Sequence, residues 1–179
     1  MTDIRAKYKP TGFLEAEPCL APAAKARFDA LVTGKEVFEI GSGGSTLWLS
    51  QRVAKLVSLE DDNDWLVVVN ARLAELGTVA DIRLVTTDEM HNSIEGMWDV
   101  IFVDPLINST RNLCILSARE HVKPGGWMVA DDYDFPFVAR AVRILRNAGW
   151  GVKVLVGTKI HPVKKAVVKT ECAFCRKPL

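Results

Sequence analysis

The sequence predicts an α/β protein with a doubly wound parallel sheet, and three observations support this prediction. Short runs rich in β-branched residues alternate with longer stretches of helical spacing, which is the pattern of successive βαβ units. Several runs are apolar almost throughout, as expected of strands that helices cover on both faces. Glycines follow the first run and precede a stretch of helical spacing, as at the ligand-binding turn of open α/β sheets.

The chain begins with an irregular segment and a helix. Residues 1–18 carry Pro10, Gly12 and Pro18 and show no steady period, which indicates an irregular arm. Residues 21–34, APAAKARFDALVTG, have proline near the start and glycine at the end and are expected to form a helix. We therefore divide the single predicted domain, 1–179, into an N-terminal arm and helix (1–34) and a sheet core (35–179).

The sheet core holds the expected strands and the helices between them. The strands are EVFEI (36–40), KLVSLE (55–60), DIRLVT (81–86), DVIFVD (99–104), GWMVAD (126–131), GVKVLVG (151–157) and ECAFCRK (171–177). Stretches of helical spacing separate them, the first over residues 46–56. No internal repeat or long linker interrupts the pattern, so one domain is expected.

Composition excludes several classes of protein. A hydrophobic fraction of 49% in 179 residues is typical of one globular domain with a sizeable core. Lys+Arg 23 against Asp+Glu 22 leaves a net charge of +1, so we expect a small-molecule partner and neither nucleic acid nor membrane. Four cysteines without a secretory signal indicate a reducing compartment and a cytoplasmic protein, and a homo-oligomer stays open.

The segment GSGGST after the first strand is the first candidate ligand site. Gly41, Ser42, Gly43 and Ser45 lie where a strand turns into a helix, and glycine lets a ligand approach the backbone closely. The dinucleotide fingerprint would need a third glycine at Thr46, so that match is incomplete. A plain tight turn is the alternative interpretation.

Carboxylates follow the second strand. Glu60 ends KLVSLE at about the distance from the glycines where an acidic residue of such folds binds ribose hydroxyls. Asp61, Asp62 and Asp64 favour the start of the next helix, whose N-terminus carries partial positive charge. Asp61 is also counted among the expected cofactor contacts.

FEIGSGGST followed by VSLEDD resembles the cofactor site of class I S-adenosylmethionine-dependent methyltransferases. The resemblance extends from about residue 37 to the last strand and implies a Rossmann-like, mostly parallel seven-stranded sheet with an antiparallel last strand. It implies that Glu39, Gly41 and Gly43 form the acidic-x-Gly-x-Gly motif, with Ser45 where a third glycine often stands. It further implies that Glu60 holds the ribose.

The same resemblance places a residue after the third strand near the adenine amine. Asp88, in LVTTDEM, is the candidate, and a surface turn aspartate is the equally weighted alternative, because Thr87 or Met90 could line that pocket instead.

Three carboxylates are expected to converge at the carboxyl ends of two neighbouring strands. Asp104 ends the fourth strand, and Asp131 and Asp132 end the fifth. Like charges this close are stable only when protonated, paired with a cation or bound to a metal, and oxygen ligands suit Mg²⁺. The arrangement is similar to that of metal-dependent O-methyltransferases, of which DDYDFPFVARAVRIL resembles the macrocin type. Asp104 as a cofactor contact and Asp132 as a helix cap are the alternatives.

We expect transfer of a methyl group from S-adenosylmethionine to oxygen of a small molecule. A metal would orient the acceptor and lower the pKa of its hydroxyl. Asp104 and His91 are the catalytic candidates, His91 as the base if no metal binds, although a solvated histidine is the more ordinary reading. An NAD-dependent oxidoreductase and a non-catalytic S-adenosylmethionine-binding protein are the alternative functions.

Three further features favour ordinary structural roles. Arg111 could neutralise the acidic cluster, but an arginine at a helix start is more often solvated. Cys172 and Cys175 form C-x-x-C within a strand, where alternation sends them to opposite faces, so core packing is expected over a zinc or redox site. The basic residues between Lys159 and Lys177 indicate a solvated hairpin.

Overall fold

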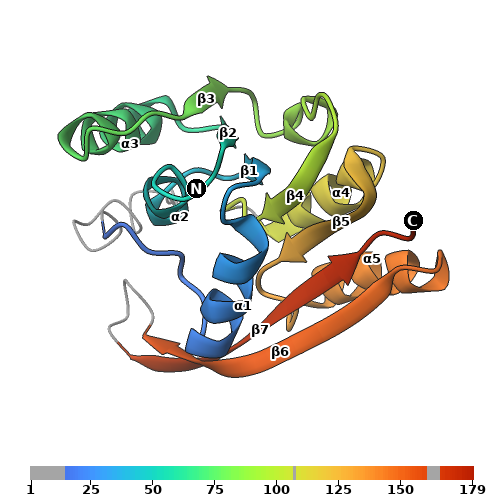
Figure 1. The fold of residues 1–179 in the computed structure, drawn as a ribbon. Helices are drawn as coiled ribbons and strands as arrows, with labels where there is room; N and C mark the ends of the chain where they lie inside the picture. The colour runs from blue at the N-terminus through green and yellow to red at the C-terminus, as the bar shows by residue number, and fades with distance from the viewer. Residues whose placement is uncertain (1–14, 107, 161–165) are drawn as a thin grey trace.

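The computed structural model describes residues 15–106, 108–160 and 166–179, and these form a seven-stranded sheet with helices on both faces (Figure 1). The proposed irregular arm falls mostly on residues 1–14, outside the described residues, and the domain boundary at residue 34 stays a prediction. The elements in chain order are α1 (Pro22–Val32), β1 (Glu36–Ile40), α2 (Gly44–Leu49), β2 (Lys55–Glu60), α3 (Asn63–Glu75), β3 (Asp81–Leu84), the 3₁₀ turn η3 (Met90–Asn92), β4 (Trp98–Val103), α4 (Asn108–Ala118), β5 (Val122–Ala130), α5 (Pro136–Asn147), β6 (Gly151–Ile160) and β7 (Val167–Arg176).

The strand order is β3-β2-β1-β4-β5-β7-β6. The pairs from β3 through β5 are all parallel, whereas β7 runs antiparallel to both β5 and β6. The predicted mostly parallel sheet with an antiparallel last strand is therefore confirmed. The order reverses between β1 and β4, which is where open α/β sheets bind ligands.

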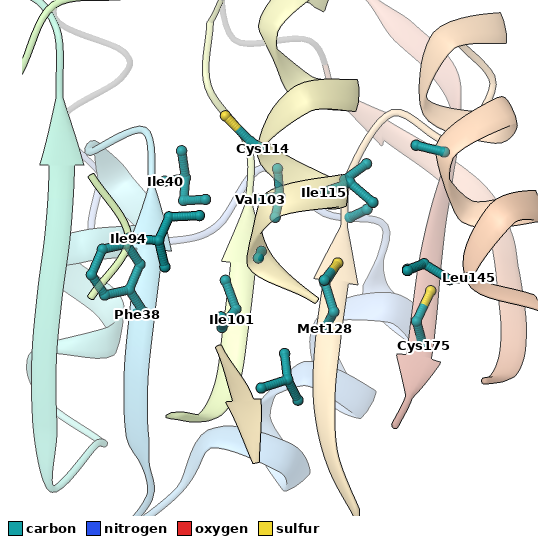
Figure 2. Packing of buried hydrophobic residues seen from close by; sticks show 14 of the residues in the cluster. Phe38, Ile40, Ile94, Ile101, Val103, Cys114, Ile115, Met128, Leu145 and Cys175 are labelled. Atoms are coloured by element: carbon teal, nitrogen blue, oxygen red, sulfur yellow. The ribbon is translucent and has the colours of Figure 1, made fainter. Parts of the chain in front are cut away.

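Alternate residues of the central strands pack on opposite faces of the sheet. Phe38 and Ile40 join Ile101 and Met128 under α4 and α5, as Figure 2 shows. On the other face, Phe28 of α1 lies fully buried beside aromatic rings of α2 and β4. Both faces are thus covered, which explains why the strand sequences are apolar throughout.

The cysteine pair follows the same alternation. Cys172 belongs to the core cluster under α1, and Cys175 belongs to the cluster under α5. Both thiols are free and buried. The prediction that C-x-x-C serves core packing is confirmed.

Local signals set the helix ends. Asp62 caps α3, since its side chain accepts hydrogen bonds from the backbone N–H of Asp64 and Trp65 at 3.0 and 3.1 Å. The helix α2 has only six residues and is shorter than the pattern over 46–56 predicts. The side chains of Ser50 and Gln51 donate to the carbonyl of Leu47 in its last turn, which competes with continuation of the helix.

The strands β6 and β7 form a long hairpin beside α1 at one edge of the sheet (Figure 1). Gly157 of β6 faces the start of α1, where a Cβ would lie 2.6 Å from the Cβ of Ala21. Close packing of α1 on the hairpin therefore requires glycine at this position. Within the described part of the chain, none of the helices has the length and apolar character needed to span a bilayer.

Candidate functional site

The loops after β1, β4 and β5 meet at one edge of the sheet. The backbone N–H of Asp104 donates to the carbonyl of Ile40 at 2.9 Å, and the N–H of Asp131 donates to that of Val103 at 3.2 Å. Each loop therefore begins as an extension of the strand ladder, which fixes Gly41, Asp104 and Asp131 side by side. The predicted convergence of these loops is confirmed.

Gly41 is required by both its conformation and its neighbour. Its φ is +94°, a region that L side chains rarely adopt. A Cβ on Gly41 would lie 2.5 Å from the carbonyl oxygen of Asp104. The loop after β1 consequently runs in direct contact with the backbone after β4, and a side chain at Gly41 would separate them.

Glu39 holds the start of α2, which follows the glycine loop, through buried hydrogen bonds. Its side chain is completely buried and accepts hydrogen bonds from the hydroxyls of Ser45, Thr46 and Ser58 at 2.5, 2.6 and 2.8 Å. Burial raises the pKa of this carboxyl to about 7, against the opposing effect of the three hydroxyls. The polar groups of Glu39 and Ser45 are directed at each other and position the loop, and their expected contacts with the cofactor stay a prediction.

Glu60 is directed at the same loop. Its carboxylate accepts hydrogen bonds from the N–H and hydroxyl of Ser42 at 3.1 and 2.5 Å, and from the N–H of Asp61 and Asp62 at 2.9 Å each. Burial raises its pKa, and the bonds from Ser42 and the backbone oppose that rise. The expected ribose contact therefore requires Glu60 to exchange Ser42 for the ribose.

Trp65 is a loop contact that the sequence analysis missed. Its indole Nε1 donates to the carbonyl of Ser42 at 2.9 Å, and its ring lies beside Gly43. Ser42 is thus held by Glu60 through its N–H and hydroxyl and by Trp65 through its carbonyl. The position of Trp65 in the first turn of the helix after Glu60 was the feature of the sequence that could have predicted this contact.

A groove of about 460 Å³ opens beside Glu60, a volume in the range of small-molecule sites. It lies between the ends of β2 and β3, where Thr87 donates a hydrogen bond to the carboxylate of Asp61. Leu84, which is 51% exposed, supplies an apolar surface there. The groove is lined by Asp61, Asn63, Leu84, Val85, Thr86, Thr87 and Glu89.

The groove combines apolar and hydrogen-bonding side chains, which is the mixture that small-molecule sites use. Asp61 and Thr87 line the groove, in agreement with the expected role of Asp61 and with the alternative weighed for Thr87. Asp88 is exposed and is not among the lining residues, and Met90 is buried in the core. The expected adenine contact of Asp88 stays a prediction.

The three predicted carboxylates lie together. Oxygens of Asp104, Asp131 and Asp132 are all within 4.8 Å of one another. Arg111 Nη2 lies 2.8 Å from Asp104 Oδ1 and its Nη1 lies 3.0 Å from Asp132 Oδ2. Lys159 Nζ lies 3.1 Å from Asp131 Oδ2. Of the three ways to stabilise such a cluster, the structure shows pairing with cations.

The alternative weighed for Arg111, that it neutralises the acidic cluster, is confirmed, whereas the expectation that these two cations are solvated is wrong. Arg111 is 5% exposed rather than solvated, and its Nε donates to the carbonyl of Pro105 at 2.8 Å. The side chain of Lys159 is 12% exposed and donates to the carbonyl of Cys19 at 2.7 Å. Opposite charge draws both side chains inward. Lys164 and Lys165 of the expected solvated hairpin lie outside the described residues.

The existing contacts of the cluster decide how well it suits a metal ion. Its all-oxygen donor set suits a hard cation such as Mg²⁺, but Arg111 and Lys159 already hold oxygens of all three carboxylates. A divalent ion fits this arrangement poorly, because it would lie beside both cations, with only the second oxygens of Asp104 and Asp131 unpaired. Metal binding by Asp104, Asp131 and Asp132 therefore has no support from the contacts seen here.

His91 lies half-buried in η3, a turn that packs on α4. Its expected role as a catalytic base stays a prediction. The backbone of Asp104 lies against Gly41 and its carboxylate pairs with Arg111, so this residue joins the glycine loop to the acidic cluster.

Comparison with curated proteins finds O-methyltransferases. The ubiquinone biosynthesis O-methyltransferase of Pseudomonas aeruginosa (strain LESB58) is 28% identical over 99 residues, which are 53% of this chain and 43% of that protein. The protein of the same name from Pseudomonas paraeruginosa (strain DSM 24068 / PA7) is 27% identical over the same length. The chain thus matches less than half the length of these relatives. No family model matches it.

Solved structures share the fold at low identity. A SAM-dependent O-methyltransferase from Thermotoga maritima superposes with a TM-score of 0.67 at 14% identity, covering 91% of this chain and 68% of that one. The N-methyltransferase NodS from Bradyrhizobium japonicum, in complex with S-adenosylhomocysteine, gives a TM-score of 0.62 at 15% identity and covers 89% of both chains. The resemblance to class I S-adenosylmethionine-dependent methyltransferases and the fold that it implies are confirmed.

Proposed function

We propose that this chain, which has the class I methyltransferase fold, transfers the methyl group of S-adenosylmethionine to an oxygen of a small molecule. The observation that carries the proposal is the Gly41–Ser42–Gly43 loop, held at the reversal of strand order beside a groove of about 460 Å³. The curated relatives are named as O-methyltransferases, which supports oxygen as the acceptor.

The residues around the groove would bind the adenosine part of the cofactor. Leu84 offers an apolar surface to the base, and Asp61 and Thr87 offer polar groups at its edge. Glu60 would exchange its bonds to Ser42 for the two ribose hydroxyls, since one carboxylate can accept both. The loop backbone at Gly41 and Gly43 would then lie against the methionine part.

Bound S-adenosylmethionine supplies a methyl group on a cationic sulfur that needs no further activation. The protein's task is therefore to align the acceptor oxygen with that methyl group and exclude water, and alignment alone can recover about 7 to 11 kcal/mol of barrier. Asp104 and the acidic cluster lie beside the loop, where they would face the acceptor. Asp104 and His91 stay the proposed catalytic residues, His91 as the base that receives the acceptor's proton.

Thermal unfolding with added ligand tests the cofactor. At a concentration 100 times its Kd, S-adenosylhomocysteine should stabilise the chain by about 2.7 kcal/mol, which corresponds to roughly 5 to 11 °C in Tm. Glu60→Gln should reduce this shift, whereas Glu75→Gln, an exposed change on α3, should leave it unchanged. Stabilisation by NAD and not by S-adenosylhomocysteine would support an oxidoreductase instead.

A second measurement separates an enzyme from a binding protein. The chain should release S-adenosylhomocysteine from S-adenosylmethionine when incubated with small phenols and catechols, with methyl ethers as products. Binding of the cofactor without turnover of any such acceptor would favour a non-catalytic S-adenosylmethionine-binding protein.

A further inference from the structure

The acidic cluster at the end of β4 and β5 contains its own counter-ions. Three carboxylates, Asp104, Asp131 and Asp132, face two cations, Arg111 and Lys159, so the fully ionised cluster carries a net charge of −1. The guanidinium bridges the carboxylates of β4 and β5, and Lys159 reaches them from β6. Every carboxylate in the cluster thus has a cation at 3.1 Å or less.

Both cations are fixed by a second bond outside the cluster. Arg111 donates through Nε to the carbonyl of Pro105, and Lys159 donates through Nζ to the carbonyl of Cys19. A side chain with two directed bonds and little exposure loses much of its freedom to move away. Displacing Arg111 would also leave a buried carbonyl without this donor, and displacing Lys159 a partly buried one, which is costly.

We propose that Arg111 and Lys159 take the place of a divalent metal in this cluster, so that the site works without one. The proposal deepens the proposed function, because it assigns the charge compensation of the acceptor site to two side chains of the protein. A metal ion would compete with these cations for the same carboxylates and would raise the charge of the cluster from −1 to +1 beside two fixed cations.

One further positive charge would neutralise the ionised cluster, whereas two would leave it with a net charge of +1. Asp131 Oδ1 is buried without a hydrogen-bond partner among the described residues, although Asp131 Oδ2 is paired with Lys159. The cluster therefore lacks one donor at this oxygen, and a divalent ion would add one positive charge more than the ionised carboxylates leave unbalanced.

An acceptor would be bound differently by this cluster than by a metal site. A metal would bind two oxygens of a diol at once. With an oxygen of each carboxylate paired to a fixed cation, binding of the acceptor does not depend on a metal that holds two hydroxyls. The proposed acceptor is therefore a small molecule that needs to present only a single hydroxyl.

Calorimetric titration with MnCl₂ tests the proposal on the full chain, stripped of metal with EDTA and dialysed. Wild type should show no saturable Mn²⁺ binding below the millimolar range. Lys159→Met exposes the Asp131 carboxylate and should bind Mn²⁺ at least about tenfold more tightly. The gain should disappear in Lys159→Met/Asp131→Asn, which removes a metal oxygen.

Controls separate charge from structure. Lys159→Arg keeps the cation and should behave as wild type, and Lys153→Met removes an exposed charge on the same strand and should also bind no Mn²⁺. Circular dichroism checks folding, and Lys159→Gln is the second variant if Lys159→Met does not fold. Micromolar Mn²⁺ binding by wild type that Asp131→Asn abolishes would overturn the proposal.

A parallel titration with S-adenosylhomocysteine keeps the two proposals distinct. Wild type should bind it equally with and without EDTA. If it binds no S-adenosylhomocysteine, the proposed function fails, while the Mn²⁺ titration still reports on the cations. Cofactor binding that requires Mn²⁺ would contradict the metal-free site.

Discussion

Replacing Glu39 by glutamine should change how stability depends on pH. Glu39 is completely buried, and its described partners are three hydroxyls and no cation. Burial raises its pKa in the folded protein from 4.5 to about 7. Between these values the folded chain keeps a proton that the unfolded chain releases, so stability is present below pH 4.5 and is lost as the pH rises through about 7. At 1.36 kcal/mol per unit, this loss amounts to about 3 kcal/mol.

Glutamine has nearly the same shape and does not ionise. The free energy of unfolding of Glu39→Gln, relative to wild type, should therefore rise by about 3 kcal/mol between pH 4.5 and 7.5. The carboxyls of the acidic cluster titrate in both proteins, so most of their contribution cancels in this difference; the part that remains is the small effect of the Glu39 charge on the pKa of Asp104.

Urea unfolding at several pH values, followed by fluorescence of the five tryptophans, measures the effect. Glu36→Gln is the matched control, since its carboxyl lies on the same strand, is 43% exposed and pairs with Lys123. That variant should change stability by about 1 kcal/mol or less. A difference between wild type and Glu39→Gln that is independent of pH would refute the argument that Glu39 is buried without a counter-ion.

Three other changes test the loop and the core. Gly41→Ala should destabilise the chain by about 3 kcal/mol or more, because the added Cβ meets the backbone of Asp104. Gly34 also has a positive φ, +71°, but an added Cβ there meets no atom within 4 Å, so Gly34→Ala should cost only about 1 to 2 kcal/mol. Equal losses of Tm in the two variants would contradict the close contact at Gly41. Trp65→Phe removes the hydrogen bond to Ser42, so it should lower the free energy of unfolding by about 1 kcal/mol and weaken the binding of S-adenosylhomocysteine. An unchanged affinity, measured by calorimetry, would show that the indole does not position the loop. Three of the four cysteines are buried, so a thiol reagent should modify no more than one thiol in the native chain and all four after unfolding; two fast native thiols would be inconsistent with the packing of C-x-x-C.

The sheet and its loops could be predicted because their signals are local. Apolar runs locate the strands, and a glycine turn between a strand and a helix locates the ligand loop. Parallel strands place their carboxyl ends at one edge, so the meeting of Asp104 with Asp131 and Asp132 followed from the order of elements.

The partners of these residues could not be predicted in the same way. Arg111 lies in the first turn of α4, and Lys159 lies near the end of β6, which runs parallel to β5. Both therefore lie at the edge where the carboxylates gather, but the sequence does not show which way a long side chain turns. Trp65 and Glu60 posed the same problem, since their contacts with Ser42 span 23 and 18 residues.

Lys159 binds the carbonyl of Cys19 and the carboxylate of Asp131 with the same ammonium group. The segment before α1 and the acidic cluster consequently share one donor, so the free energy of attaching that segment is linked to the free energy of ionising the cluster. A molecule that lifts the chain around Cys19 away from β6 would release one bond of that ammonium, change its hold on Asp131 and so alter how readily the carboxyl takes up a proton. By reciprocity, protonating Asp131 would loosen the attachment of the segment around Cys19.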